Sequence, residues 1–255
     1  GNYTEDDVKQ GARAFTGWMH DGTEFFFNRR QHDYGVKRFL GVAGGLNGDD
    51  VLEIILSKPA CPKFIASELF AFFAYPEPGE AIVQTLASQF RQTNFEIRPL
   101  LKTILRSKAF YSANCIGAQI KCPVQLVVGT VRLLGIQMPP PQMMFGALNL
   151  MGQVPMMPPN VKGWAGGRTW INASTLFARY NTAVRLAGGK LSIDDVPRDD
   201  PPALVDALLN RLIQRPVDDS RRQVLLDGCR SRARPEQAVR EVCQLIVSMP
   251  EYQLC

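Results

Sequence analysis

The sequence lacks any apolar run long enough to cross a membrane as a helix. A bilayer-spanning helix needs about 20 consecutive, mainly apolar residues. The densest apolar segment, 64–75, is shorter and contains Ser67 and Glu68, so it predicts a buried helix rather than a membrane span. Residues 1–7 are polar and acidic, which is unlike a signal peptide, and any export signal would therefore have to precede them.

Common catalytic and metal-binding motifs are also missing. The chain contains no GxSxG, SxxK or HExxH pattern and no GxxxxGK[ST] phosphate loop, and the glycines of 163–167 lack the lysine that such a loop requires. The six cysteines form no CxxC pair, and the two histidines lie far from all of them in sequence. These absences argue against familiar hydrolases, nucleotide-dependent enzymes and Cys/His zinc sites, so we expect no metal and no cofactor.

The cysteines and the basic residues each leave two interpretations open. The pairs Cys115/Cys122 and Cys229/Cys243 fit either disulfides in an exported protein or small buried apolar side chains. The net charge is +5, and no aromatic residue interleaves the densest basic cluster. We therefore interpret this cluster as a solvated helix face, with nucleic-acid binding as the weaker alternative. It consists of Arg221, Arg222, Arg230, Arg232 and Arg234.

Repeated amphipathic segments predict a mainly α fold, a multi-helix bundle. Apolar residues recur at helical spacing, with capping residues or prolines at the start of segments and glycines at the end. Thr4 and Asp7 fit a capping box, Asp49 or Asp50 a further cap, and Asn172 or Ser174 the start of a helix with the stripe Leu176, Phe177, Tyr180 and Val184. The expected helices cover about 5–17, 51–56, 63–74, 82–90, 97–105, 123–134, 143–151 and 172–187, with three more in 203–247.

Two segments break this helical spacing. Residues 23–27 are extended and aromatic, 28–35 are polar and 36–40 are apolar again, which indicates one short β-hairpin or an ordered irregular loop. Residues 154–170 combine prolines, glycines and two tryptophans, which predicts a long ordered loop. We expect a main helical domain over 1–189, a polar linker over 190–202 and a small three-helix unit over 203–255.

The loop that follows Met151 carries most of the candidate binding residues. Tryptophan faces stack on sugar or aromatic rings, and Arg168 can pair with an anionic group. The opposing interpretation is a structural strap, because prolines reduce the entropy lost on ordering and tryptophans bury large areas. The candidates for ligand or partner binding are Trp18, Gln153, Trp164, Arg168, Trp170 and Asn172.

A second cluster near the N-terminus contains the candidate catalytic residues His20, His32 and Asp33. A histidine beside a carboxylate can act as a general base, provided that the groups converge. Hydrogen bonds from His32 and Asp33 that stabilise turns are the competing interpretation.

Several short motifs are spread along the chain: Tyr-Thr-Glu-Asp-Asp-Val at 3–8, Ala-Phe-Thr-Gly-Trp at 14–18, His-Asp-Tyr-Gly-Val-Lys at 32–37, Leu-Gly at 40–41, Arg-Leu-Leu-Gly at 132–135, Met-Gly-Gln at 151–153, Pro-Pro at 158–159, Lys-Gly-Trp at 162–164 and Trp-Ile-Asn at 170–172. Together these motifs resemble the DUF1800 family. The end at 250–255 resembles planctomycete-type members. The resemblance implies the C-terminal portion of a longer, exported bacterial protein whose gene often lies beside one for a DUF1501-type protein. It implies no chemistry.

These observations favour a non-catalytic exported module in the periplasm, the cell envelope or the extracellular space. We expect it to bind a polysaccharide or an exported partner protein, such as the DUF1501-type neighbour, through the 154–170 loop and the hairpin from His20 to Asp33. The alternative is a hydrolase-type enzyme that acts on a cell-surface polymer and has His32 and Asp33 in its site.

Overall fold

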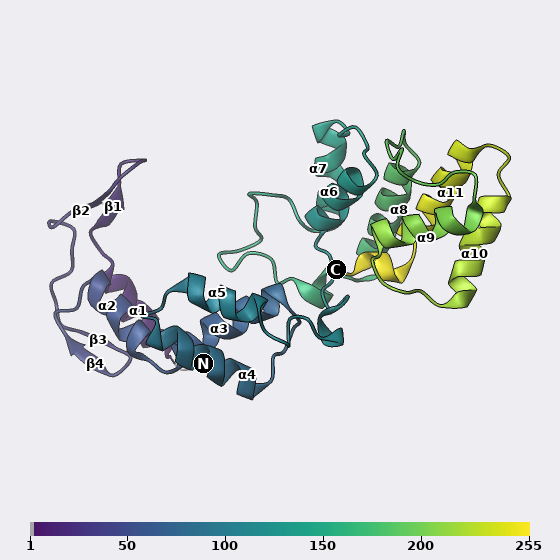
Figure 1. The fold of residues 1–255 in the computed structure, drawn as a ribbon. Helices are drawn as coiled ribbons and strands as arrows, with labels where there is room; N and C mark the ends of the chain where they lie inside the picture. The colour runs from purple at the N-terminus through teal and green to yellow at the C-terminus, as the bar shows by residue number, and fades with distance from the viewer. Residues whose placement is uncertain (1–2) are drawn as a thin grey trace. The chain divides into compact units, whose positions relative to one another are not determined.

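The computed structural model describes residues 3–255, and the predicted mainly α fold is confirmed there by eleven α-helices and four short strands. The chain forms two compact units (Figure 1). The first comprises Gly1–Phe73 and Glu77–Ser107, and the second comprises Ala74–Pro76 and Lys108–Cys255. Within the described part of the chain, no helix combines the length and apolarity needed to cross a membrane.

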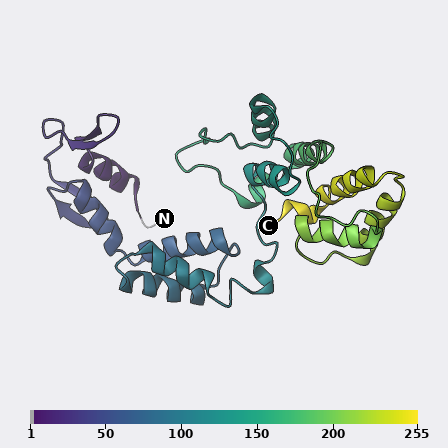
Figure 2. The ribbon, with the colours of Figure 1, turned by 45° about the horizontal axis from the view of Figure 1, so that its top comes forward.

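The first unit combines helices with two small hairpins. As predicted, Thr4 and Asp7 form a capping box at the first helix. The last three helices lie side by side (Figure 2) and bury Phe70, Phe90 and Leu100 between them. The elements are α1 (Glu5–Ala14), β1 (Trp18–His20), β2 (Phe25–Phe27), β3 (Lys37–Phe39), β4 (Val42–Gly44), α2 (Gly48–Ser57), α3 (Ala60–Phe73), α4 (Glu80–Gln92) and α5 (Ile97–Leu105).

Two antiparallel hairpins occupy the region where one was expected. β1 pairs with β2 through Trp18↔Phe27, and β3 pairs with β4 through Lys37↔Gly44. The segments 23–27 and 36–40 therefore do not pair with each other. Gly22 and Gly41 have φ values of +110° and +87°, which let each segment turn back on its immediate neighbour.

Some local details of the first unit also differ from the sequence-based prediction. Asn47 caps α2 by accepting from the amides of Asp49 and Asp50, so neither aspartate is the N-cap residue. The predicted buried helix, α3, buries only one face and leaves Phe64 and Phe72 exposed.

The second unit places six helices and three 3₁₀ turns around one core. Pro123 opens α6 and Asn172 caps α8, both as predicted. The elements are η1 (Ala113–Cys115), α6 (Pro123–Leu133), α7 (Pro141–Leu150), η2 (Gly167–Trp170), α8 (Ala173–Ala187), α9 (Pro201–Leu212), α10 (Asp219–Arg230), α11 (Pro235–Val247) and η3 (Pro250–Gln253).

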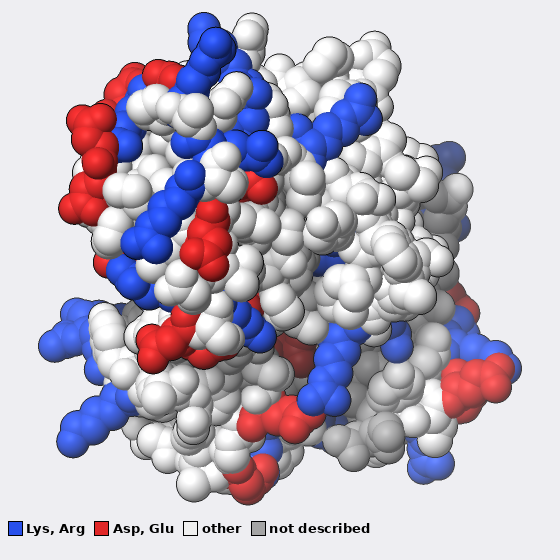
Figure 3. All heavy atoms as spheres, turned by 90° about the vertical axis from the view of Figure 1, so that its right-hand side faces the viewer, with Lys and Arg blue, Asp and Glu red and all other residues white. Residues whose placement is uncertain are grey.

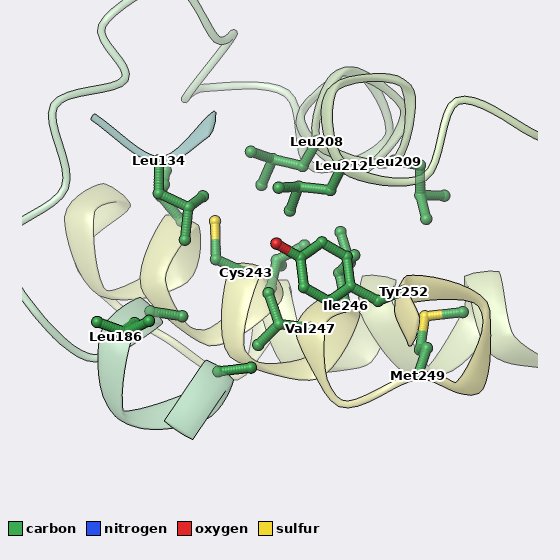
Figure 4. Close-up of a cluster of buried hydrophobic side chains, with 14 of the residues drawn as sticks. Leu134, Leu186, Leu208, Leu209, Leu212, Cys243, Ile246, Val247, Met249 and Tyr252 are labelled. Atoms are coloured by element: carbon green, nitrogen blue, oxygen red, sulfur yellow. The ribbon is translucent and has the colours of Figure 1, made fainter. Parts of the chain in front are cut away.

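Tyr252 lies at the centre of this core. Figure 4 shows its ring among Leu212, Ile246 and Val247. Its hydroxyl lies 2.7 Å from that of Thr130, so both buried hydroxyls are satisfied. Burial raises the pKa of Tyr252 to about 12.

Helices α9–α11 share this core with α6 and α8. Ile193 and Val196, from the predicted linker, are also buried in it. The domain boundaries expected at 190 and 202 stay a prediction.

Gly135 ends α6 in the left-handed conformation, as predicted, with φ +59°. A Cβ at this position would lie 2.4 Å from the carbonyl oxygen of Ser192. We expect Gly135→Ala to lower the free energy of unfolding by at least ~1–2 kcal/mol, measured by urea denaturation. The control Gly146→Ala, inside α7 with no atom near the added Cβ, should raise it by about 0.5–1 kcal/mol. Equal effects of the two substitutions would contradict the left-handed conformation of Gly135.

Candidate functional site

The candidate catalytic residues of the first unit take part in local structural contacts. The carboxylate of Asp33 accepts from Nε and Nη2 of Arg13 at 2.7 and 3.2 Å, and from the amide of Gly35 at 2.8 Å. The Arg13 guanidinium is the main reason that the pKa of Asp33 falls to about 2. An already paired carboxylate that is charged at neutral pH is a poor proton acceptor.

His32 anchors the segment after β2. Its Nδ1 lies 2.8 Å from the carbonyl oxygen of Thr16, which can only accept, so Nδ1 carries a proton. The ring also packs edge-on against Phe27 and Tyr34. These contacts match the turn-stabilising interpretation, and the catalytic role of His32 stays a prediction.

Trp18 and His20 belong to strand β1 and have different surroundings. Trp18 packs edge-on against Phe15 and Phe25, and a Cβ at Gly48 would lie 2.4 Å from its ring. His20 is exposed and accepts from the amide of Gly22 at 3.2 Å. Trp18 therefore serves packing, and His20 supports a turn. Over residues 3–255, no three His, Cys, Asp or Glu side chains gather as a metal site would require.

The candidate residues of the 154–170 loop all lie in the second unit, and several of them fix its ends. Oε1 of Gln153 accepts from the amide of Val124 at 3.1 Å, and Asn172 caps α8 by accepting from the amide of Thr175 at 3.0 Å. Trp170 is buried. These three residues hold the loop in place, as the strap interpretation expects.

The middle of the loop is different. Trp164 is half-buried and Arg168 is exposed. Met156, Met157 and Val161 are 94%, 71% and 105% exposed. A strap that pinned helices together would bury such apolar side chains, so this part of the loop is a surface.

A groove of about 500 Å³ lies beside the C-terminal end of the loop, within the second unit. Leu176, Phe177 and Tyr180 of α8 form part of its wall. The sequence predicts that these three residues form a helical stripe with Val184, and in the structure they are 46%, 71% and 45% exposed. The other lining residues are Ile120, Ile171, Ser248, Pro250, Gln253 and Leu254.

The face of α8 that is buried instead contains Arg179, Ala183, Leu186 and Ala187. Arg179 makes this buried face hard to recognise in the sequence, because an arginine is rarely buried without a charged partner. The presence of apolar residues on two faces of one helix is the signal that could have revealed the groove.

Charged side chains cover the surface of α10 and its neighbours in pairs. Arg222 donates to both carboxylate oxygens of Asp206 at 2.8 Å, and Arg232 donates to Glu241 at 2.7 Å. Figure 3, which views the molecule from the side of α10 and α11, shows basic and acidic side chains interspersed. The arrangement fits the predicted solvated face.

All six cysteines are free thiols. Cys229 and Cys243 are buried in the core of the second unit, as the interpretation of small apolar side chains expects. Burial raises the pKa of Cys243 to about 12.

The fold and the site together define a mainly α protein with a preformed apolar groove and an exposed apolar loop. The sequence model of the family described as "Protein of unknown function (DUF1800)" matches residues 1–254, and the chain belongs to this family. No curated protein and no solved structure shows significant similarity to the chain.

Replacing Asp33 by Asn should lower stability at neutral pH. The folded pKa of Asp33 is about 2, below the unfolded value of about 3.9. Its contribution is therefore complete above pH ~4 and is lost as the pH falls toward 2. The thermal midpoints of Asp33→Asn and the unmodified chain should converge over this range. A difference that persists unchanged at pH 2 would refute the role of the ion pair.

The thiols should differ in reactivity under native conditions. Cys243 has no exposed surface and a raised pKa, so almost no reactive thiolate is present at pH 8. Thiol titration with a chromogenic disulfide should leave Cys243 unmodified until urea unfolds the chain. Rapid native modification, located by peptide mass spectrometry, would contradict this burial.

Proposed function

We propose that this chain is a non-catalytic binding module that recognises a partner protein through the apolar middle of its long loop. We define this loop surface as Met156, Met157 and Val161. The single observation that carries the proposal is the near-complete exposure of these three side chains on a loop whose ends are fixed. Exposed apolar groups gathered at one place are typical of interaction sites.

The loop is ordered before any partner binds. Pro155, Pro158 and Pro159 restrict its backbone, and the carbonyl and side chain of Asn160 accept from the amides of Gly163 and Lys162 in a tight turn. Met156 has φ +65°, an unfavourable left-handed conformation for a methionine. A preorganised loop loses little entropy on binding, which favours affinity.

The chemistry of the surface favours a protein over a polysaccharide. Methionine side chains adapt to irregular apolar partners. Sugar recognition relies on accessible aromatic faces, but Trp170 is buried and Trp164 is half-buried. We propose an exported protein of the DUF1501 type as the partner. We also propose that the protein is exported to the periplasm, the cell envelope or the exterior. This part of the proposal rests on the sequence resemblance alone.

The double variant Met156→Ser/Met157→Ser should abolish partner binding and leave stability unchanged, because neither side chain packs in the core. Binding to a purified DUF1501-type protein and to soluble polysaccharides would be measured by biolayer interferometry, and stability by thermal unfolding. The control Trp170→Ala removes a buried aromatic and should cost about 3–5 kcal/mol of stability. A loss of stability in the double variant would support the strap, and polysaccharide binding that survives the change would contradict the proposed surface.

A further inference from the structure

The apolar groove of the second unit has no role in the proposed loop surface, and its dimensions suit a small molecule. Its volume of about 500 Å³ lies within the range of roughly 300–1,000 Å³ typical of ligand sites. One wall is the exposed face of α8 with Leu176, Phe177 and Tyr180. The groove is therefore preformed and open to solvent.

The C-terminal segment of the chain forms another wall of the groove. The backbones of Ile120 and Leu254 meet in an antiparallel bridge, and η3 contributes Pro250 and Gln253. Almost every lining group is apolar. The hydroxyl of Ser248 already donates to the carbonyl of Gln244 at 2.6 Å. The amide of Gln253 is thus the main polar feature of this wall.

Buried positive charge lies next to this amide. Arg179 has no exposed surface; its Nε donates to Oε1 of Gln253 at 2.8 Å and its Nη2 to the carbonyl of Lys121 at 2.7 Å. Its Nη1 is buried and has no hydrogen-bond partner among residues 3–255. Burial lowers the pKa of Arg179 below its usual value. An unsatisfied buried guanidinium nitrogen is costly and marks a place where an anion would be stabilised.

Two further cations border the same segment. Nζ of Lys121 donates to the carbonyl of Tyr252 at 2.8 Å, and Nη2 of Arg215 donates to that of Glu251 at 3.3 Å. Within the described chain, the hydrogen bonds of Lys121 and Arg179 go to carbonyl and amide oxygens, not to carboxylates. Burial lowers the pKa of Lys121 to about 8; the charge of Cys255 opposes this shift, and Arg179 and Arg215 add repulsion. Lys121, Arg179 and Arg215 therefore bring positive charge to the C-terminal segment that lines the groove.

We propose that the groove binds an amphiphile with one apolar chain and one carboxylate. The apolar chain lies along Leu176, Phe177 and Leu254, and the carboxylate lies at Gln253. Because Oε1 of Gln253 is engaged by Arg179, its amide NH₂ is the group left to donate to the carboxylate. The charges of Arg179 and Lys121 supply the attraction, which is strong where water is excluded.

The charge and the apolar wall make separate contributions to affinity. Each added methylene that enters the groove should strengthen binding roughly threefold to fourfold. The carboxylate should strengthen binding about tenfold or more over an alcohol of equal chain length, since hydrogen bonds to a charged group are the stronger ones.

The test is calorimetric titration of the whole chain with octanoate, decanoate and dodecanoate below their micelle concentrations. We expect one saturable site, affinity that rises with chain length, and at least about tenfold weaker binding of dodecanol and dodecyltrimethylammonium. No saturable binding, or equal binding of the three twelve-carbon compounds, would overturn the proposal.

Leu176→Glu places a charge on the groove wall at an exposed position and should weaken dodecanoate binding at least about tenfold. Its matched control is Val224→Glu on α10, which is 58% exposed and lies outside the groove. Both variants should keep the circular-dichroism spectrum and the sedimentation coefficient of the unmodified chain. Unchanged binding in Leu176→Glu would overturn the site. If Leu176→Glu instead dissociates a dimer that does not bind dodecanoate, the groove is a self-association surface and the proposal is wrong.

Discussion

Three cationic side chains hold the C-terminal segment in place by hydrogen bonds, and the structure of the second unit depends on these bonds. Arg215, Lys121 and Arg179 donate in turn to Glu251, Tyr252 and Gln253. The amides of Lys121 and Cys255 complete the attachment by donating to the carbonyls of Gln253 and Gln119. Through these bonds Tyr252 enters the core and Gln253 reaches the groove. The C-terminal segment is thus both a structural closure of the helical core and one wall of the candidate site.

This arrangement has an electrostatic cost. Removing charged groups from water is unfavourable, and hydrogen bonds to carbonyl oxygens compensate only partly. The lowered pKa of Lys121 and the Nη1 of Arg179, which has no partner among the described residues, both reflect positive charge that is only partly compensated. Packing offsets the cost, because Tyr252 is almost fully buried and the Lys121 ammonium lies 3.9 Å from the centre of its ring. A fold that keeps partly compensated positive charge beside an open apolar groove is well suited to an anionic, apolar ligand.

Much of the helical fold was predictable from the sequence, because caps and periodicity are local signals. Thr4, Pro123, Gly135 and Asn172 each mark a helix end where it was expected. The strand pairing was not predictable, because a short strand can pair with any neighbouring strand. The turns at Gly22 and Gly41 decide that β1 pairs with β2 and β3 with β4. For the candidate site, the long loop was predictable from its prolines and glycines, whereas Gln153, Trp170 and Asn172, predicted as binding residues, fix its ends in the structure. The groove was not predicted, because the buried face of α8 contains Arg179, a residue normally assigned to solvent.

One scaffold presents two candidate binding surfaces: an exposed methionine-bearing loop and a groove closed by the C-terminal segment. The groove exists only if the segment stays attached, and Arg179 is the central attachment. Amide hydrogen exchange in Arg179→Met tests this dependence most directly. The account predicts that the amides of Lys121 and Cys255 exchange at least about tenfold faster than in the unmodified chain, while the amide of Leu208 in α9 keeps its protection. Unchanged protection of Lys121 and Cys255 in this variant would contradict it.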